Sequence, residues 1–235
     1  MALNALPDQA EKRAAVQTMF DRIAPRYDRL NRLISAGLDQ SWRRTALDAI
    51  GVGTGDRVID LACGTGDLAE QSALRGASVL GVDFAFEMLR GAQRRGIRAN
   101  LLQADGAALP FLDASASVLT CGFALRNFVA LDEIFAESAR VLEPGGRIAL
   151  IEVDRPRNRL FAAGHSFYFD RVVPVIGGLL SDRTAYAYLP QSTVYLPVEA
   201  ELLGMLEAAG FEQVEKRGFL FGAAQLITGV RSKIR

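Results

Sequence analysis

The sequence contains little cysteine and histidine, the residues on which disulfide frameworks and most zinc sites depend. There are two cysteines and one histidine among 235 residues. Cys63 and Cys121 each end a predicted buried strand, so we expect free thiols in a reducing compartment instead of a disulfide. These residues do not have the spacing of metal ligands, and we expect no metal.

Long apolar runs and an excess of charge of either sign are also missing. The longest obvious apolar run, 172–180, has roughly half of the ~20 residues that span a bilayer, which argues against a transmembrane helix. Residues 1–12 lack the apolar core of a signal peptide, and we therefore expect a cytoplasmic protein. The formal net charge is zero, so the chain has no overall attraction to nucleic acid, and we expect none as a partner.

Apolar segments do occur, in an alternating pattern. Half of the residues are hydrophobic, which at this length allows one domain with a substantial core. Strands that alternate with helices predict a doubly wound, mostly parallel α/β sheet, and two late β segments predict a C-terminal antiparallel hairpin. The seven predicted strands are 57–61, 78–82, 99–103, 117–121, 147–153, 211–218 and 223–230.

The segments outside this sheet divide the single domain into parts. After a polar, loose stretch at 1–12, apolar residues recur at helical spacing. These helices form either a packed layer or a lid with Tyr27 and Asp28 on its inner face. Pro25 should interrupt them because proline lacks the N–H that a helix needs. The expected parts are a helical lid at 1–50, a cofactor-binding core at 51–155, an inserted cap at 156–197, and a helix and hairpin at 198–235.

The run from Val58 to Ala69 is the centre of the sequence. A short apolar strand leads into a glycine turn and then a helix, an arrangement that lets a ligand approach the backbone and directs helix N–H groups at its polar end. Gly64, Gly66 and Ala69 also satisfy the G-x-G-x-x-G/A pattern of dinucleotide-binding proteins. The turn alone therefore does not identify the cofactor.

Three acidic residues favour a methyl donor over a dinucleotide. Asp83 ends the second strand, about the ~20-residue distance from the turn at which a carboxylate accepts hydrogen bonds from ribose hydroxyls. Asp105 ends the third strand, where it could accept from an adenine amine. Asp60 lies inside the first strand, where a carboxylate is costly without donors or a cation. Capping and turn formation are the alternative for these acids, but together they suit the ammonium and sulfonium of S-adenosylmethionine better than a pyrophosphate.

The spacing Asp60-x-x-x-Gly64-x-Gly66, followed by acids at later strand ends, resembles the nucleotide site of the Rossmann-like methyltransferases. The resemblance implies that the glycine turn contacts the methionine part of S-adenosylmethionine. It also implies that Asp83 holds the ribose and Asp105 the adenine amine, with two apolar side chains beside the nucleoside. The expected cofactor-binding residues are Asp60, Gly64, Thr65, Gly66, Asp83, Phe84, Met88, Asp105, Gly106 and Gly122.

Two runs narrow the resemblance. Residues 19–28, MFDRIAPRYD, and residues 122–127, GFALRN, resemble motifs of the ubiquinone/menaquinone-biosynthesis C-methyltransferases, and the similarity extends roughly over 18–231. It implies methyl transfer to a ring carbon of a prenylated quinol, and the menaquinone precursor is favoured as the substrate over the ubiquinone precursor. Ala69 and Gly122 depart from the polar residues usual in the family, which leaves a different ring open.

Such a reaction needs a phenolate held in line with the methyl donor. Arg126 and Asn127 follow the fourth strand and are the expected catalytic pair. Arg126 would lower the pKa of the phenol and orient a water, and Asn127 would orient the hydroxyl or the water. Tyr27 is expected to bond the ring oxygen. Helix capping by the pair and core packing by Tyr27 are the alternatives, and His165 lies outside every matched motif.

Other functions stay open on the sequence alone. The chain could methylate another small aromatic molecule on carbon or oxygen, or bind S-adenosylmethionine as a regulator without catalysis. A dehydrogenase that uses NAD is a further alternative. The cap at 156–197 either receives the prenyl tail or simply covers the domain. A peripheral contact with the membrane and a homodimer are also left open.

Overall fold

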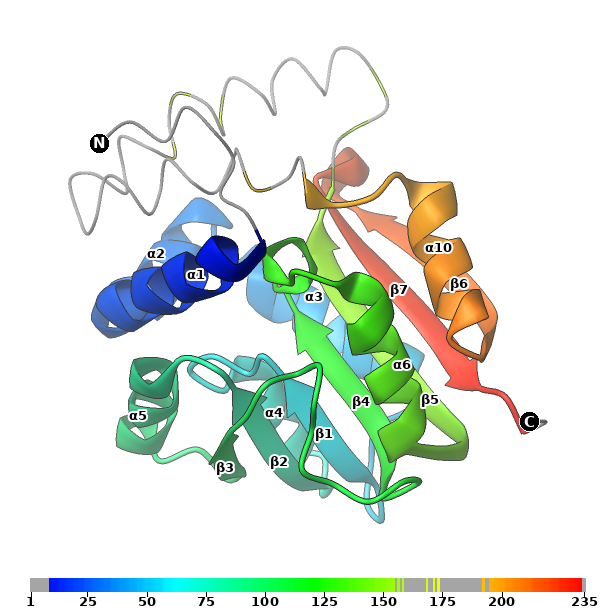
Figure 1. Ribbon diagram of the computed structural model, residues 1–235. Coiled ribbons are helices and arrows are strands. Elements are labelled where there is room, and N and C mark those ends of the chain that lie inside the picture. The colour runs from blue at the N-terminus through cyan, green and yellow to red at the C-terminus, as the bar shows by residue number, and fades with distance from the viewer. Residues whose placement is uncertain are drawn as a thin grey trace.

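The computed structural model describes residues 9–154 and 195–233, with side chains from Lys12 onward. Between these stretches it describes six isolated residues: Pro156, Asn158, Tyr168, Arg171, Val173 and Ser192. His165 and most of the predicted cap at 156–197 lie outside the described residues. Figure 1 shows the arrangement of the elements.

One sheet forms the centre of the described chain. Its strands are β1 (Arg57–Leu61), β2 (Ser78–Asp83), β3 (Asn100–Gln103), β4 (Ala116–Gly122), β5 (Leu142–Val153), β6 (Phe211–Phe219) and β7 (Ala224–Arg231). They lie in the order β3-β2-β1-β4-β5-β7-β6. β1 to β5 are parallel, and β7 pairs antiparallel with β5 and β6. The predicted seven-stranded, mostly parallel sheet with a C-terminal hairpin is confirmed.

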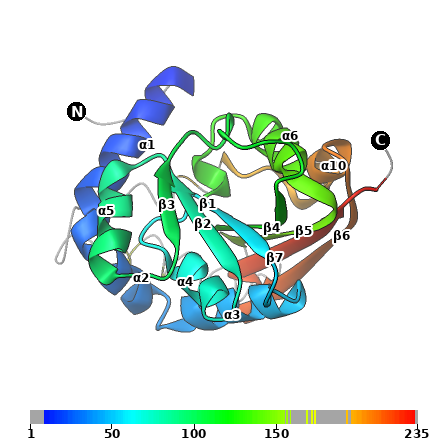
Figure 2. The same cartoon turned by 90° about the horizontal axis from the view of Figure 1, so that it is seen from below.

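Helices cover both faces of the sheet. They are α1 (Gln9–Ile23), α2 (Tyr27–Ile34), α3 (Leu38–Ala49), α4 (Asp67–Ala73), α5 (Phe86–Arg95), α6 (Leu131–Val141) and α10 (Glu199–Ala208). Phe135 of α6 and Leu202 of α10 belong to one core cluster, and Leu47 of α3 and Leu68 of α4 to another. Figure 2 shows the two helix pairs on opposite sides of the sheet. Among the described helices, none is long and apolar enough to cross a membrane.

The N-terminal helices form where the sequence predicts them, with one difference. α1 ends at Ile23, Pro25 lies in a short 3₁₀ turn (Ala24–Arg26), and α2 begins at Tyr27. The expected interruption at Pro25 is therefore confirmed. The expectation that residues 1–12 are loose is wrong for their last part, because α1 already begins at Gln9 and the Lys12 side chain is buried against backbone carbonyls.

β5 is longer than predicted. It begins at Leu142, which pairs with Ala116, and an irregularity separates this pair from the next one, Val118 with Arg147. The left-handed φ of +85° at Gly145 accommodates the irregularity, since glycine adopts such angles without a steric penalty. The predicted strand at 147–153 is thus the regular part of a longer strand.

The strand order places two of the sequence motifs side by side. β1 lies between β2 and β4. The strands from β1 to β3 are added toward one edge of the sheet, and β4 and β5 are added toward the other, so the boundary of β1 and β4 is the topological switch point. At such a switch point the loops after neighbouring strands diverge and leave a crevice at their carboxyl ends. The glycine turn follows β1, and the run GFALRN overlaps the end of β4.

Candidate active site

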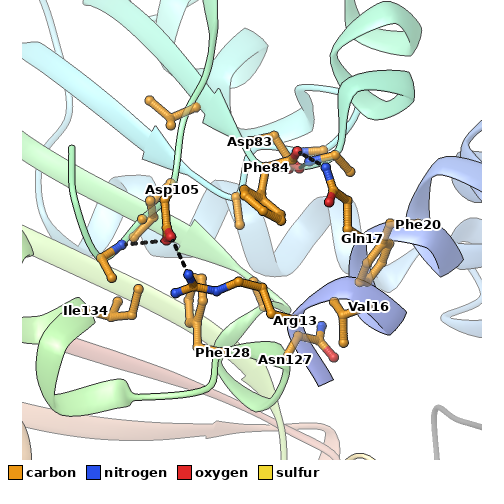
Figure 3. Close-up of a pocket in the computed structure, with 18 of the residues that line it drawn as sticks. Arg13, Val16, Gln17, Phe20, Asp83, Phe84, Asp105, Asn127, Phe128 and Ile134 are labelled. Carbon is orange, nitrogen blue, oxygen red and sulfur yellow. Dashed lines mark hydrogen bonds and ion pairs between the residues drawn. The ribbon is translucent and has the colours of Figure 1, made fainter. Parts of the chain in front are cut away.

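A cavity of about 520 Å³ lies at this switch point, within the roughly 300–1,000 Å³ typical of ligand pockets. Its walls come from α1, from the turns after β1 to β4, and from the start of α6, and Figure 3 shows part of the lining. The predicted site residues in the lining are Tyr27, Gly64, Asp83, Phe84, Met88, Asp105, Gly106, Gly122 and Asn127.

A smaller cavity of about 20 Å³ lies beside the glycine turn. Its lining contains the predicted residues Asp60 and Thr65, together with Arg43 and Asp67. The residues that line both cavities are Tyr27, Ala62, Gly64 and Gly122. The two spaces therefore meet at the glycine turn.

The glycines of the turn are needed for its backbone. Gly64 and Gly66 have left-handed φ angles of +58° and +87°. A Cβ at Gly66 would come within 2.3 Å of Cδ1 of Ile97, and Gly66 precedes α4 as its N-cap. Gly66 is not in the described lining of either cavity, so its place in the site is conformational.

Asp60 is buried beneath the turn and hydrogen-bonded by the protein. The Thr120 hydroxyl donates to Oδ1 at 2.7 Å, and the Ala69 N–H donates to Oδ2 at 3.0 Å. Burial raises its pKa to about 7, although the Thr120 bond and the positive charge of Arg43 act in the opposite direction. Asp60 thus joins β1 to β4 and to α4, and a cation placed nearby would favour its ionised form.

Asp83 connects the glycine turn to the start of α5. Its Oδ2 accepts from the Gly64 N–H at 2.7 Å, and its Oδ1 accepts from the Ala85 N–H at 2.8 Å. Burial raises its pKa to about 6, while the bonds from Ala85 and Gly64 lower it. The carboxylate also lines the large cavity, next to Phe84 (Figure 3).

Asp105 forms an ion pair with a residue that the sequence did not indicate. Nη1 of Arg13, on α1, lies 3.0 Å from Oδ2 of Asp105, and the Ala107 N–H donates to Oδ1 at 3.0 Å. One turn along α1, the Gln17 amide donates to the Phe84 carbonyl at 3.1 Å (Figure 3). α1 is therefore fastened across the cavity at two of the positions expected to bind the nucleoside.

Tyr27, the first residue of α2, lies over the glycine turn. Its ring carbon Cε1 is 3.9 Å from the point where a Cβ of Gly64 would be. Burial raises the pKa of the Tyr27 hydroxyl, and the positive charges of Arg43 and Arg126 counteract this. Thr65 donates a short hydrogen bond to Asp28. Tyr27 and Asp28 are thus both on the face of α2 that meets the turn.

Arg126 is buried beside the cavity and paired with Glu152 of β5. Its backbone N–H and its Nη1 both donate to the Glu152 carboxylate, and Nε donates to the Ser192 hydroxyl at 3.1 Å. Nη1 also donates to the Phe123 carbonyl at 2.8 Å. Arg126 is absent from the described lining of both cavities, so the structure does not place this predicted residue at the cavity surface.

Asn127 does reach the large cavity, and its amide oxygen is free to accept. Oδ1 is buried and has no hydrogen-bond partner among the described residues. A buried acceptor without a donor is unfavourable, so this atom suits a ligand that donates a hydrogen bond. The neighbouring carbonyls of Arg126 and Phe128 accept from the Lys12 ammonium at 3.3 and 2.9 Å, which ties α1 to this turn.

Sequence reasoning missed Lys12, Arg13 and the pairing of Glu152. Glu152 had a usable signal, since a carboxylate inside a predicted buried strand needs a partner. Lys12 and Arg13 had none, because they lie in a polar stretch that looks like any solvated N-terminus. No group of three or more metal-ligating side chains occurs in the described part of the chain.

The cavity fits a charged nucleoside such as S-adenosylmethionine. Its lining has the carboxylates of Asp83 and Asp105, a glycine turn that admits close approach, and the unpaired Asn127 oxygen, and Asp60 lines the adjoining smaller cavity. A solved structure described as a possible histamine N-methyltransferase from Thermotoga maritima has the same fold, with a TM-score of 0.64 and 18% identity over 92% of this chain and 100% of that one. The fold is the Rossmann-like fold of such methyltransferases.

Sequence comparison identifies the family. The profile of the ubiE/COQ5 methyltransferase family matches residues 8–231. A demethylmenaquinone methyltransferase from Thermus thermophilus is 44% identical over 220 residues, covering 91% of this chain and 100% of the relative. A ubiquinone/menaquinone biosynthesis C-methyltransferase UbiE from Geobacter sulfurreducens is 41% identical over 229 residues, covering 93% and 89%. The chain belongs to the ubiE/COQ5 methyltransferase family.

The predicted family, enzyme class and cofactor are confirmed by these comparisons, and the protein is an S-adenosylmethionine-dependent methyltransferase. The alternative of an NAD-dependent dehydrogenase is thereby removed. The roles of the individual site residues stay predictions, because sequence similarity does not place a ligand against them.

Binding of S-adenosylmethionine should weaken as the pH falls from 7.5 to 5.5. Burial raises the pKa values of Asp60 and Asp83 to about 7 and 6, so acid would neutralise one carboxylate that we expect near the cationic end of the donor and one that we expect to accept hydrogen bonds from the ribose. We expect the dissociation constant from titration calorimetry to rise about tenfold over this range. Asp83→Asn should bind more weakly throughout and give a shallower profile, and a flat wild-type profile would contradict the roles of both acids.

Proposed function

We propose that this enzyme C-methylates the ring of a prenylated quinol, with the demethylated menaquinone precursor ahead of the ubiquinone precursor. The observation that carries the proposal is the near-full-length similarity to relatives with these activities in their names, at 40–44% identity. O- or C-methylation of another small aromatic molecule and binding without catalysis are the competing functions.

The donor end of the proposed site lies at the glycine turn and the strand ends. Asp83 and Asp105 would hold the ribose and the adenine amine, with Phe84 and Met88 beside the nucleoside. When bound, S-adenosylmethionine supplies the methyl group on its sulfonium. The protein's contribution is to hold the acceptor carbon near that group, which can lower a barrier by up to ~7–11 kcal/mol.

The acceptor end would lie near Asn127 and Tyr27, which both line the large cavity. The unpaired Oδ1 of Asn127 can accept from a ring hydroxyl and so fix the orientation of the ring. The Tyr27 hydroxyl can donate to the second ring oxygen. Both groups are neutral, so their role would be to position the quinol. Stabilising the phenolate formed from it would require a positive charge from another residue.

Arg126 can supply that charge without touching the substrate. Its positive charge already acts on the phenol of Tyr27, whose pKa it lowers against the effect of burial. A quinol hydroxyl in the same part of the cavity would experience the same field, because charge–charge interactions extend further in a low-dielectric interior. Glu152 would hold the guanidinium in place, and its negative charge would partly offset the electrostatic effect of Arg126 on the substrate. Arg126 is then an electrostatic residue behind the cavity wall.

We also propose that α1 and α2 form a lid over the donor. The lid would be closed by Arg13 on Asp105, Gln17 on the Phe84 carbonyl, and Asp21, whose carboxylate accepts from the Glu87 N–H at 2.9 Å. Each bond crosses from α1 to a strand end or to α5. Peripheral membrane contact, which would give access to a prenylated substrate, and a homodimer stay predictions.

The substrate is tested by incubating the protein with isotopically labelled S-adenosylmethionine and a panel of quinols, followed by mass spectrometry. We expect the label on a ring carbon of demethylmenaquinol, or of the ubiquinone precursor. Label on oxygen, or on another aromatic substrate only, would replace the proposed reaction. Binding of the donor without transfer to any acceptor would favour the regulator.

Asn127→Ala should lower kcat for the quinol about 10- to 100-fold, because one hydrogen bond to the reacting ring is lost. The dissociation constant of S-adenosylmethionine should change less than threefold. Asn100→Ala, an exposed position on β3, is the control and should leave both quantities unchanged. A normal kcat in Asn127→Ala would remove Asn127 from the acceptor site.

Arg13→Ala should increase the rate constants for both association and dissociation of S-adenosylmethionine in stopped-flow measurements. Arg13 and Asp105 are partly exposed, so we expect a change of about two- to fivefold. Arg29→Ala, on the exposed side of α2, is the matched control. Unchanged rate constants in Arg13→Ala would show that α1 does not close the donor site.

A further inference from the structure

Lys12 of α1 is a buried lysine that the proposed donor and acceptor sites do not use. The residue is 5% exposed, and burial lowers the pKa of its ammonium. Among the described residues no carboxylate is paired with it, and its partners are two backbone carbonyls and one aromatic ring. Neutral acceptors compensate only in part for the hydration that a buried ammonium loses. Lysine is therefore an unfavourable residue here unless its contacts serve a purpose.

The two carbonyls lie on either side of Asn127 along the chain. Nζ of Lys12 donates to the Arg126 carbonyl at 3.3 Å and to the Phe128 carbonyl at 2.9 Å. The Arg126 carbonyl shares a planar peptide unit with the Asn127 N–H, so a bond that fixes this oxygen also fixes that unit. The second bond fixes the peptide unit that follows Phe128. Lys12 thus holds the backbone before and after the residue whose amide lines the large cavity (Figure 3).

The turn that carries Asn127 is short and depends on outside contacts. It is a single 3₁₀ turn (Leu125–Asn127), and the backbone becomes extended at Phe128. Carbonyls at the end of a helix have no partners within it, and a lysine ammonium is one of the groups that can bond to them. α1 supplies this ammonium from a distant part of the sequence. The position of α1 and the geometry of the turn are therefore linked through one side chain.

A third contact joins Lys12 to the segment before α10. Nζ of Lys12 lies 3.9 Å from the centroid of the Tyr195 ring, within the roughly 6 Å at which an aromatic face attracts a cation. The attraction is stronger for a cation that has lost its water. The ring therefore helps to hold the ammonium that in turn holds the carbonyls of the Asn127 turn.

We propose that Lys12 is a positioning residue for methyl transfer, which keeps the Asn127 amide in the orientation that the quinol requires. The inference rests on the proposed acceptor site, in which Asn127 accepts a hydrogen bond from a ring hydroxyl. Lys12 is absent from the described lining of both cavities, so it acts through the turn and not by contact with a ligand. A misplacement of about 1 Å in a reacting pair can cost on the order of 100-fold in rate.

A double-mutant cycle tests this role. Lys12→Met keeps the length of the side chain without the ammonium, and it should lower kcat for the quinol about tenfold. The dissociation constant of S-adenosylmethionine should change less than threefold. Because Lys12 acts through Asn127, the double variant Lys12→Met/Asn127→Ala should have the kcat of Asn127→Ala to within about threefold. Lys233→Met makes the same change at an exposed lysine and should leave kcat unchanged.

Two substitutions of Tyr195 test the third contact, and they do not require Lys12→Met to fold. Tyr195→Phe keeps the aromatic face, and Tyr195→Leu removes it. We expect the kcat of Tyr195→Leu to be about two- to fivefold below that of Tyr195→Phe, and this difference should vanish when each is combined with Asn127→Ala. Circular dichroism checks the folding of every variant. Equal kcat values for the two Tyr195 variants would contradict the proposal.

The outcomes separate the role of Lys12 from the acceptor site on which it rests. A wild-type kcat in Lys12→Met overturns the role of Lys12 alone, and so does the full tenfold loss on top of Asn127→Ala. A rise in the dissociation constant of S-adenosylmethionine as large as the fall in kcat would place the effect at the donor end and also overturn it. If Asn127→Ala itself keeps a normal kcat, the proposed acceptor site fails, and the role of Lys12 fails with it.

Discussion

The carboxylate of Asp67, in the first turn of α4, joins the N-terminal helices to the sheet. Burial alone would raise its pKa, but the charges of three arginines outweigh this effect and hold the pKa at about 2. They come from three different helices: Arg43 from α3, Arg95 from α5 and Arg32 from α2. The junction keeps its charge at any pH near neutrality. Because Asp67 directly follows the glycine turn, the same cluster fixes the turn, the start of α4 and the position of α2.

The sheet could be predicted because its signals are local. Each parallel strand is a short apolar segment with its own flanking turn, and the positions of Asp83 and Asp105 at strand ends follow from the topology. The start of β5 could not be predicted, since the pairing of Leu142 with Ala116 depends on a neighbouring strand and overrides the Pro-Gly signal between Leu142 and Arg147.

The site was predicted less completely, for a physical reason. The sequence indicates which side chains lie near the carboxyl edge, but their direction depends on contacts between distant residues. Phe123 has a left-handed φ of +62°, and its carbonyl accepts a hydrogen bond from the Arg126 side chain. This bond and the pairing with Glu152 hold the Arg126 guanidinium behind the cavity wall. Asn127, the next residue, faces the cavity instead. Neither direction can be read from the run GFALRN.

The contacts of α1 could not be predicted for a similar reason. Lys12 and Arg13 bond to residues that are far away in the sequence, at Arg126, Phe128 and Asp105. In the sequence they are two charges of a polar segment. In the fold they occupy one turn of a helix that spans both ends of the cavity.

This adjacency of Lys12 and Arg13 has a kinetic consequence. Lys12 bonds to the turn at the proposed acceptor end, Arg13 pairs with Asp105 at the proposed donor end, and a rigid helical turn moves as a unit. If α1 lifts to let the spent donor leave, the acceptor end loses its support in the same event. The two products would then leave during one opening, and a single rate constant would govern their release.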